Sequence, residues 1–246
     1  MRGLQVLECF GERDRDRGLS LTEIASRTGI DTATVLRLLT TYCVAGYLRR
    51  DETTNLYSLT ARILRLSQGI TWYQVLIEVA RPHLTDLRDH VSEVVHLGVI
   101  EDNRVVYIDK LEAAQSVKLV SAVGQIMPLN TTALGKALLA ARVASGGESL
   151  ADYKEGFESR TARSLTSDKR LGDELKRTAE RGYSIDDMEN EDGVLCVGAP
   201  IFNRSGVAIA ALSVSGPEYR MRQHIEDVGA RCSKVAEQIG AELRAY

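Results

Sequence analysis

A predicted helix in the N-terminal part of this 246-residue chain carries side chains suited to contact with nucleic acid. One face of the helix holds only short or hydrogen-bonding residues together with one arginine: Thr32, Ala33, Thr34 and Arg37. Such residues reach base edges or phosphates when their helix lies in the major groove of DNA. The spacing therefore predicts a DNA-reading face, provided that the neighbouring elements leave it open.

Two further motifs suggest other binding chemistry, but their spacing disfavours it. Gly135-Lys136 is typical of a phosphate-binding loop, yet Asn130 stands at the first glycine position and Ala137 replaces the hydroxyl that would hold magnesium. The acidic run 186–192 lacks the alternating ligands and the central glycine of a calcium loop. It predicts a solvated turn, with Asp186 as the exception.

Histidine and cysteine residues give no sign of a metal site or a nucleophile. The four histidines show no paired ligand spacing with one another or with the cysteines, which lie at positions 9, 43, 196 and 232. A catalytic Cys196 would need a histidine close to it in space. We therefore expect no metal, no cofactor and no enzymatic activity.

The elements that must present the DNA-reading face form a predicted helix-turn-helix over Leu21–Leu48. Ser20 and Glu23 match a capping box that starts the first helix. Gly29 suits a turn that needs positive φ, and Asp31 is the expected N-cap of the second helix. The second helix packs inward through residues three or four positions apart: Val35, Leu38 and Leu39. Spacing alone would also fit two ordinary amphipathic helices, an alternative that the next segment disfavours.

The segment after this motif favours a winged form. Tyr47–Arg50 and Asn55–Leu59 are β-compatible and flank a polar turn, so we expect a hairpin. Arg49 and Arg50 lie on this wing, where arginine suits bidentate contacts to phosphate and guanine. Arg2–Phe10 supplies a leading helix. The first 68 residues carry a net charge of +2 and the remainder −5, a sign that suits DNA binding by the N-terminal part.

Length and composition indicate a globular protein of two domains. A chain of 246 residues with 44% hydrophobic content can bury a sizeable core in each domain. Its apolar stretches fall short of the roughly 18 to 20 residues that span a bilayer, and its start does not fit a secretory signal. We therefore expect a cytoplasmic protein with no membrane partner.

After the wing, predicted strands and helices alternate. A long helix over Gln74–Val91, which Pro82 should bend or divide, precedes a hairpin of Glu93–Ile100 and Arg104–Leu111, with Ser116–Val120 as a third strand. The remaining predicted elements are helices Thr131–Arg142 and Asp168–Arg181, strands Tyr183–Ile185, Val194–Phe202 and Val207–Ser215, and a terminal helix with an apolar stripe from Ile225 to Leu243. This order predicts an α+β, GAF-like domain with an antiparallel sheet, typical of small-molecule sensors.

Three stretches of the sequence match one family pattern. They are RGLQVLECF with LTEIASRTGIDTATVLRLL and GYLRRDETTNLYSL, then VGQIMPLNTTALGKALLA, and finally DDMENEDGVLCVGAPIFNRSGVAIAALSVSGP. On these stretches the chain resembles the isocitrate-lyase-regulator (IclR) family of bacterial transcriptional regulators. The resemblance implies a winged helix-turn-helix domain over 1–70, a linker helix over 71–91 and an effector-binding and oligomerisation domain over 92–246.

The same resemblance implies a mode of action and a binding site. The protein would be a homodimer, associating further to a tetramer, that binds a palindromic DNA operator and answers to a small organic acid or aromatic metabolite. The effector site would comprise Ala133, Leu134, Asp186, Cys196, Ser213 and Ser215. Exposed backbone amides of Ala133 and Leu134 at a helix start suit a carboxylate. Ser213 and Ser215 alternate on one strand, so both hydroxyls share a face with a ligand beside Cys196.

Other interpretations of these residues stay open at this point. Apart from the resemblance, the two serines fit ordinary edge or surface positions, and Cys196 fits a small buried hydrophobe. The family pattern is broken at four positions: Asp31 and Thr32 at the start of the recognition helix, Asn130 and Met188. Operator contacts therefore cannot be copied from relatives, and the size and polarity of the effector site do not follow from the resemblance. A different class of function would make 92–246 a binding or enzymatic domain and the N-terminal domain an oligomerisation module.

Overall fold

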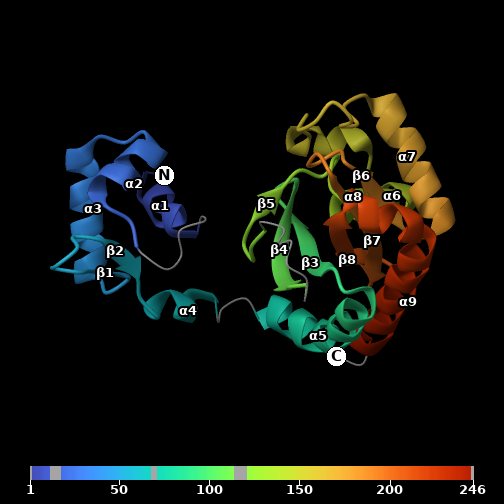
Figure 1. Cartoon of the computed structure of the whole chain (residues 1–246), viewed down its shortest axis with the longest axis horizontal. Coiled ribbons are helices and arrows are strands. Elements are labelled where there is room, and N and C mark those ends of the chain that lie inside the picture. Colours follow the sequence, from blue (N-terminus) through green and yellow to red (C-terminus); the bar gives the residue numbers. More distant parts are fainter. Residues whose placement is uncertain (1, 12–17, 68–70, 114–120, 245–246) are drawn as a thin grey trace. The chain divides into compact units, whose positions relative to one another are not determined.

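The computed structural model describes residues 2–11, 18–67, 71–113 and 121–244. The chain divides into two compact units, residues 1–72 and 73–246, which are described separately here (Figure 1). In the described part, no helix has the length and apolar character needed to cross a membrane.

The first unit contains the predicted helix-turn-helix and hairpin. Its elements are α1 (Arg2–Glu8), the 3-10 turn η1 (Cys9–Gly11), α2 (Leu21–Thr28), α3 (Thr32–Val44), β1 (Leu48–Arg50), β2 (Tyr57–Leu59) and α4 (Arg62–Ser67). Strands β1 and β2 pair antiparallel, which confirms the wing. Strand β1 begins one residue later than predicted, because the Tyr47 N–H is bonded to the carbonyl of Tyr42. Strand β2 begins two residues later, because Asp51 Oδ1 accepts from the backbone N–H groups of Thr53 and Thr54, and Asn55 has φ 58°. The connecting turn therefore takes in Asn55.

Short-range hydrogen bonds fix the helix-turn-helix. Ser20 Oγ accepts from the Glu23 N–H, and Glu23 Oε2 accepts from the Ser20 N–H. The predicted capping box is therefore confirmed. Gly29 ends α2 with φ 66°, a left-handed conformation that glycine adopts without strain. Thr28 donates from Oγ1 to the carbonyl of Ile24 at 2.8 Å, which satisfies a hydroxyl at an otherwise apolar position. The unit's core contains Val6, Leu19, Ile24, Val35, Leu39, Leu48 and Tyr57.

The second unit is built on one antiparallel sheet. Its strands are β3 (Val94–Glu101), β4 (Arg104–Leu111), β5 (Ile126–Met127), β6 (Ser184–Asp187), β7 (Val194–Phe202) and β8 (Ala208–Pro217), in the spatial order β5-β4-β3-β8-β7-β6. Its helices are α5 (Thr71–Val91), α6 (Ala133–Ala144), η2 (Leu150–Gly156), α7 (Asp168–Arg181), α8 (Glu218–Met221), η3 (Arg222–His224) and α9 (Ile225–Leu243). The predicted α+β class with an antiparallel sheet is confirmed.

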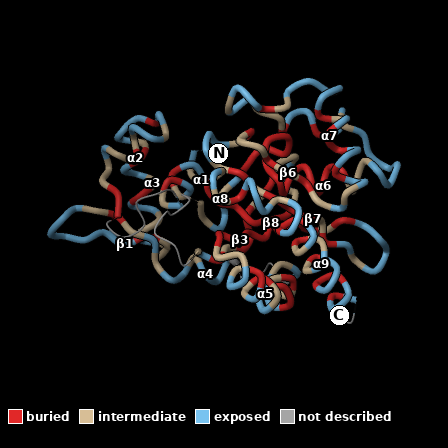
Figure 2. Tube along the Cα trace, turned by 45° about the vertical axis from the view of Figure 1, so that its right-hand side comes forward, coloured by how far each residue is buried: buried red, intermediate tan, exposed pale blue. Residues whose placement is uncertain are grey.

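Helices cover both faces of this sheet. Apolar side chains of α5 and α9 pack on one face, through a core that includes Leu84, Leu97, Leu212 and Ile239. Helix α6 covers the other face and is buried along Ala133–Ala140, with α7 packed against it. Figure 2 shows the buried positions gathered in the sheet and α6, and the exposed ones on the outer loops.

Two glycines of the sheet let α6 approach closely. A Cβ on Gly198 would lie 3.1 Å from the carbonyl carbon of Ala133, the first residue of α6. A Cβ on Gly98 would lie 2.9 Å from a methyl group of Leu134. The N-terminus of α6 therefore rests directly on the middle of strands β3 and β7.

The structure bears on three predictions about the second unit. The third strand of the first hairpin is β5, which pairs with β4, whereas Ser116–Val120 lies outside the described residues. Helix α5 is continuous, so Pro82 does not divide it. The acidic run 186–192 is solvated only in part: Asp186, the expected exception, is 1% exposed, but Glu189 is also buried at 6%, which the prediction of a solvated turn did not include. The burial of Glu189 is explained by its ion pair with Lys136 of α6.

Candidate functional site

Helix α3 presents the predicted DNA-reading face to solvent. Thr32, Ala33 and Arg37 are exposed and Thr34 is half-buried, while Val35 and Leu39 on the opposite side are fully buried. No hydrogen bond among the described residues holds the guanidinium of Arg37. This surface therefore leaves an arginine and short polar groups available at the start of an exposed helix, the arrangement that base and phosphate contacts require.

The N-terminus of α3 is closed by its own cap. Asp31 Oδ1 accepts from the Thr34 N–H at 2.8 Å, and this bond holds the pKa of the carboxyl below its usual value. The acidic cap thus neutralises part of the helix-terminal charge that a phosphate would otherwise use. An anion at this helix end meets a carboxylate, so phosphate contacts must come from side chains rather than from the backbone amides that begin α3.

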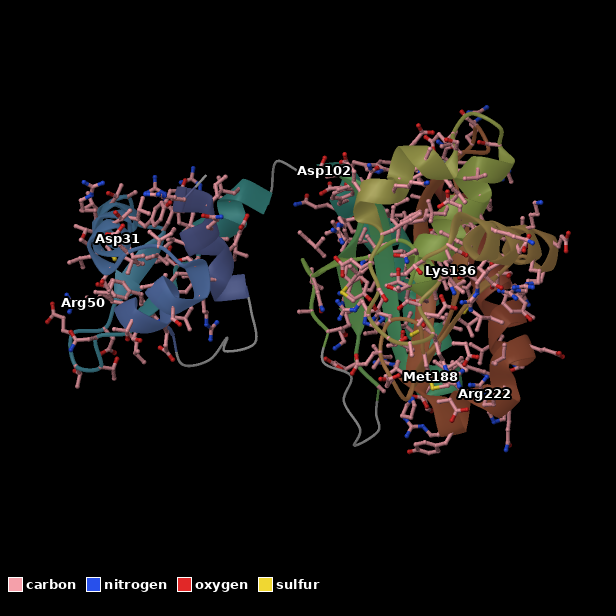
Figure 3. All side chains as sticks on the ribbon, turned by 90° about the horizontal axis from the view of Figure 1, so that it is seen from above. Asp31, Arg50, Asp102, Lys136, Met188 and Arg222 are labelled. Carbon is pink, nitrogen blue, oxygen red and sulfur yellow. The ribbon has the colours of Figure 1, made fainter. Side chains whose placement is uncertain are left out.

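The wing offers two exposed arginines with different freedom. Arg50 donates from Nη2 to Asn55 Oδ1 at 2.6 Å and lies over the ring of Tyr57, whose centroid is 5.7 Å away. Arg49 is exposed on the other side of β1. Figure 3 labels Arg50 on the wing and Asp31 on the same unit. The hairpin therefore holds the guanidinium of Arg50 in place and leaves Arg49 exposed to solvent.

The residues predicted to bind an effector meet on one face of the sheet. In the register of β6, β7 and β8, Cys196 lies opposite both Asp186 and Ser215, and Ser213 lies opposite Gly198. Side chains of directly opposed residues in an antiparallel sheet point to the same side. Asp186, Cys196, Ser213 and Ser215 therefore share the face that α6 covers, and they lie beside its N-terminus because Ala133 rests on Gly198.

The start of α6 supplies backbone donors to this face. Thr132 caps the helix by accepting from the Gly135 N–H at 3.1 Å, and the hydroxyl of Ser184 donates to the carbonyl of Ala133 at 2.6 Å. Among the described hydrogen bonds, none uses the N–H of Ala133 or Leu134. Both residues are buried, at 2% and 1% exposed, so these amides are enclosed rather than exposed as predicted. Enclosed, unpaired donors at a helix N-terminus favour an anionic group.

Asp186 is held in the site by its own turn. Its Oδ1 accepts from the N–H groups of Glu189 and Asn190 at 2.8 and 3.2 Å, around Met188, which has φ 59°. Burial nevertheless raises the pKa of Asp186 to about 7, against the opposing effect of Lys136. The carboxyl therefore takes up or releases a proton near neutral pH.

A buried lysine ties this turn to α6. Lys136 is fully buried, and its Nζ donates to Glu189 Oε1 at 2.5 Å and to the carbonyl of Ile185. Figure 3 labels Lys136 and Met188, the residue before its partner in the turn. The turn is held on its other side by Ser164 Oγ, which donates to the carbonyl of Glu189 at 2.7 Å. This ion pair, which was not predicted from the sequence, explains why Glu189 of the acidic run is buried.

The remaining groups of the site are uncharged. Burial raises the pKa of the Cys196 thiol well above its usual value, and the neighbouring Asp186 raises it further while Ser215 lowers it. Burial likewise raises the pKa of Tyr107, on which Cys196 and Asp186 also act. A thiol with a raised pKa is a poor nucleophile. The arrangement is therefore suited to binding through neutral hydrogen bonds rather than to covalent chemistry.

His96 and Tyr107 join this face from β3 and β4, although the sequence analysis did not select them. His96 lies opposite Ser213, and its ring centroid is 4.6 Å from that of Tyr107. His96 stands in an apolar stretch of β3, and that isolated polar residue is the signal that could have identified it, whereas β4 carries several polar residues and gives no such signal for Tyr107. The described residues contain no group of three or more His, Cys, Asp or Glu side chains that could hold a metal ion.

Family models match both units of this chain. The model described as the bacterial transcriptional regulator IclR C-terminal domain matches residues 71–241, and the IclR helix-turn-helix domain matches residues 1–52. The chain belongs to the IclR family. It is therefore a transcriptional regulator of the IclR type, with a helix-turn-helix DNA-binding domain and an effector-binding C-terminal domain.

Several relatives and solved structures similar to this IclR-family protein support the assignment. The HTH-type transcriptional regulator KdgR of Escherichia coli (strain K12) is 31% identical over 96% of this chain and 90% of the relative. The acetate operon repressor of Salmonella typhimurium is 30% identical over 97% of this chain and 87% of the relative. Thermotoga maritima IclR superposes with a TM-score of 0.78 at 27% identity, covering 99% of this chain and 97% of that one.

A further solved structure contains a small aromatic acid. An IclR homolog from Microbacterium hydrocarbonoxydans, solved in complex with 4-hydroxybenzoate, superposes with a TM-score of 0.83 at 25% identity and covers 100% of this chain and 98% of that one. These relatives are transcriptional regulators, so an enzymatic C-terminal domain with an N-terminal oligomerisation module is not favoured.

Proposed function

We propose that two copies of this IclR-family protein bind a palindromic operator, with one α3 helix in each of two successive major grooves. The observation that carries the proposal is the open face of α3, where Thr32, Ala33, Thr34 and Arg37 stand outside the core. A twofold protein requires two half-sites about one helical turn apart. Arg49 and Arg50 of the wing are the proposed contacts to phosphate or to the neighbouring groove.

Fluorescence anisotropy tests the DNA-binding proposal. The protein is titrated onto its own upstream intergenic DNA and onto a scrambled duplex, each across a salt series. We expect a preference of about 10³-fold or more for the native DNA, with affinity falling as salt rises. Arg37→Ala should remove most of this preference, whereas Arg170→Ala, which removes an exposed arginine from α7, should not. Equal losses in the two variants would contradict the assignment of α3.

We propose further that the effector is a small organic acid, with an aromatic acid as one form, and that it binds beside the N-terminus of α6. The amides of Ala133 and Leu134 would receive its carboxylate, and the hydroxyls of Ser213 and Ser215 would donate to it. Asp186 and Cys196 would face the rest of the molecule. The support is the enclosed pair of unpaired amides together with the polar face of the sheet. The complex of the Microbacterium homolog with 4-hydroxybenzoate suggests the first compound to try.

Isothermal titration calorimetry with benzoate and 4-hydroxybenzoate tests the ligand class. Ser213→Ala with Ser215→Ala should weaken binding of an acid that the wild type binds by about 1 to 3 kcal/mol per lost partner, while operator binding without ligand persists. Ser233→Ala on α9, whose hydroxyl donates to the carbonyl of Gly182, is the control. Loss of folding in the double variant would make the two serines structural instead.

Regulation requires that the two proposals be coupled. The acid would bind one arrangement of the effector domains better than another, and α5, proposed as the linker helix, would pass the difference to the DNA-binding unit. A coupling of about 1 to 3 kcal/mol would change operator affinity about 5- to 150-fold. A ligand that binds without changing operator affinity would refute this coupling.

A further inference from the structure

His96 is a buried polar residue of the effector domain that the proposed ligand contacts leave without a role. It is 3% exposed on β3, opposite Ser213 and beside Ser215 of β8. Its neighbours on the other side are Tyr107 and Lys110 of β4 and Ser121. A buried imidazole in a mostly apolar strand needs partners for both ring nitrogens.

Both nitrogens of the His96 ring face serine hydroxyls. Nε2 lies 2.8 Å from Ser121 Oγ, and Nδ1 lies 3.5 Å from Ser215 Oγ. Ser121 is itself held by Lys110, whose Nζ donates to the Ser121 carbonyl at 2.9 Å. The ring therefore forms the middle of a chain that begins at an anchored serine and ends at Ser215, next to the proposed carboxylate position.

The imidazole in this chain is uncharged. Burial lowers the pKa of His96 to about 3, and the positive charge of Lys110 lowers it as well. A neutral imidazole carries one N–H, so one nitrogen donates and the other accepts. The hydrogen bond at one nitrogen thus decides the role of the other.

The polarity of the chain decides what Ser215 can offer a ligand. When Nδ1 carries the proton, it donates to Ser215 Oγ, and the Ser215 hydroxyl is free to donate outward. When Nε2 carries the proton, Ser215 donates to Nδ1 and presents only lone pairs to the ligand. A carboxylate accepts hydrogen bonds and donates none, so only the first arrangement serves an acid.

We propose that His96 is a positioning residue of the effector site: Ser121 donates to its Nε2, its Nδ1–H donates to Ser215, and Ser215 therefore points its proton at a carboxylate ligand. The three groups then orient their dipoles toward the same anion as the N-terminus of α6. This inference rests on the proposed organic-acid effector. Neutral His96 would thus make the site prefer ligands that accept a hydrogen bond from Ser215 over ligands that donate one to it.

A matched pair of substitutions separates the two ends of the ring. The amide nitrogen of asparagine reaches the place of Nδ1, and the side-chain amide of glutamine reaches that of Nε2. His96→Asn should therefore keep the donor to Ser215 and hold 4-hydroxybenzoate within about twofold of the wild type. His96→Gln should keep the hydrogen bond with Ser121 but lose the donor to Ser215. It should therefore weaken binding of 4-hydroxybenzoate by about 3- to 10-fold. Equal losses in the two variants, with equal thermal unfolding midpoints, would overturn the positioning role.

The tautomer is measured directly on the full-length protein without any ligand. Long-range nitrogen–proton NMR spectra of histidine-labelled protein distinguish the two tautomers, and the spectrum of His96→Asn identifies the His96 signals among the four histidines. We expect the Nδ1–H form, unchanged between pH 8 and pH 5. An Nε2–H form overturns the proposal whichever acids bind. If neither benzoate nor 4-hydroxybenzoate binds while the Nδ1–H form is present, the aromatic-acid form of the proposed effector fails and the orientation of Ser215 stands.

Discussion

Replacing Lys136 with methionine tests whether a buried ion pair holds the effector site together. Lys136 is fully buried in α6 and pairs at 2.5 Å with Glu189, whose side chain is 8% exposed. Glu189 Oε2 already has no hydrogen-bond partner among the described residues. Lys136→Met therefore leaves a buried carboxylate with no opposing charge, in the turn that also carries Asp186.

The expected loss of stability is large. Removing one partner of a buried ion pair costs about 3 to 5 kcal/mol, because the remaining charge stays desolvated. For a unit of the size of residues 73–246, each kcal/mol lowers the melting temperature by about 2 to 4 °C. We therefore expect the melting temperature of the second unit to fall by about 6 to 20 °C in Lys136→Met.

Differential scanning calorimetry of the full chain measures this shift, and Lys154→Met is the matched control. Lys154 pairs with Asp168 at 2.6 Å, but the two side chains are 52% and 58% exposed. An exposed pair contributes about 0 to 1 kcal/mol, so the control should lower the melting temperature by at most about 4 °C. Adding Glu189→Gln to Lys136→Met should recover part of the loss, since the neutral amide removes the unpaired charge.

Two results would refute this reasoning. Equal shifts in Lys136→Met and Lys154→Met would mean that burial adds nothing to the pair. A double variant of Lys136→Met with Glu189→Gln that is as unstable as the sum of the two single changes would mean that the residues do not interact.

Three further predictions concern the same unit. Burial raises the pKa of Asp186 from 3.8 to about 7, so between these values the folded unit keeps a proton that the unfolded chain releases. The free energy of unfolding should therefore fall as pH rises through this window, and denaturant titrations at pH 5 and pH 8 should show a smaller fall in Asp186→Asn. Gly198→Ala would place a Cβ 3.1 Å from the backbone of Ala133, so it should displace the start of α6 and weaken binding of any acid found by calorimetry, while unliganded operator affinity stays the same. Arg81→Ala removes the 2.5 Å partner of Asp109, whose side chain is 4% exposed and whose Oδ2 has no hydrogen-bond partner among the described residues. The change should cost about 1 to 3 kcal/mol in chemical denaturation. A cost no larger than that of an exposed ion pair would show that Asp109 finds another partner.

The predictions that depend on residues close together in the sequence agree best with the structure. The capping box at Ser20 and Glu23 and the N-cap at Asp31 each join groups three positions apart, so their residue types alone specify the bonds. The turn between β7 and β8 is similar, because Asn203 Oδ1 accepts from the N–H groups of Ser205 and Val207. Strand β7 and helix α7 accordingly have the bounds expected from sequence.

The acidic run 186–192 shows where such reasoning fails. Its composition favours solvation, and no residue near it in the chain opposes that preference. The partner of Glu189 is Lys136, which lies 53 positions earlier. Because the pair forms only when α6 packs over β6 and β7, its charges could not be assigned to the interior from sequence.

The sequence by itself determined the helix-turn-helix, the wing, the order of strands and helices and the IclR family, because those features depend on periodicity, capping and local motifs. Tertiary structure decided the rest: that α6 begins on Gly198 beside Cys196 and Ser215, that His96 joins them from β3, and that Asp186 is buried with a raised pKa. These properties arise from desolvation and from contacts between strands that are distant in the chain. Neither can be read from residue types before the sheet register is known.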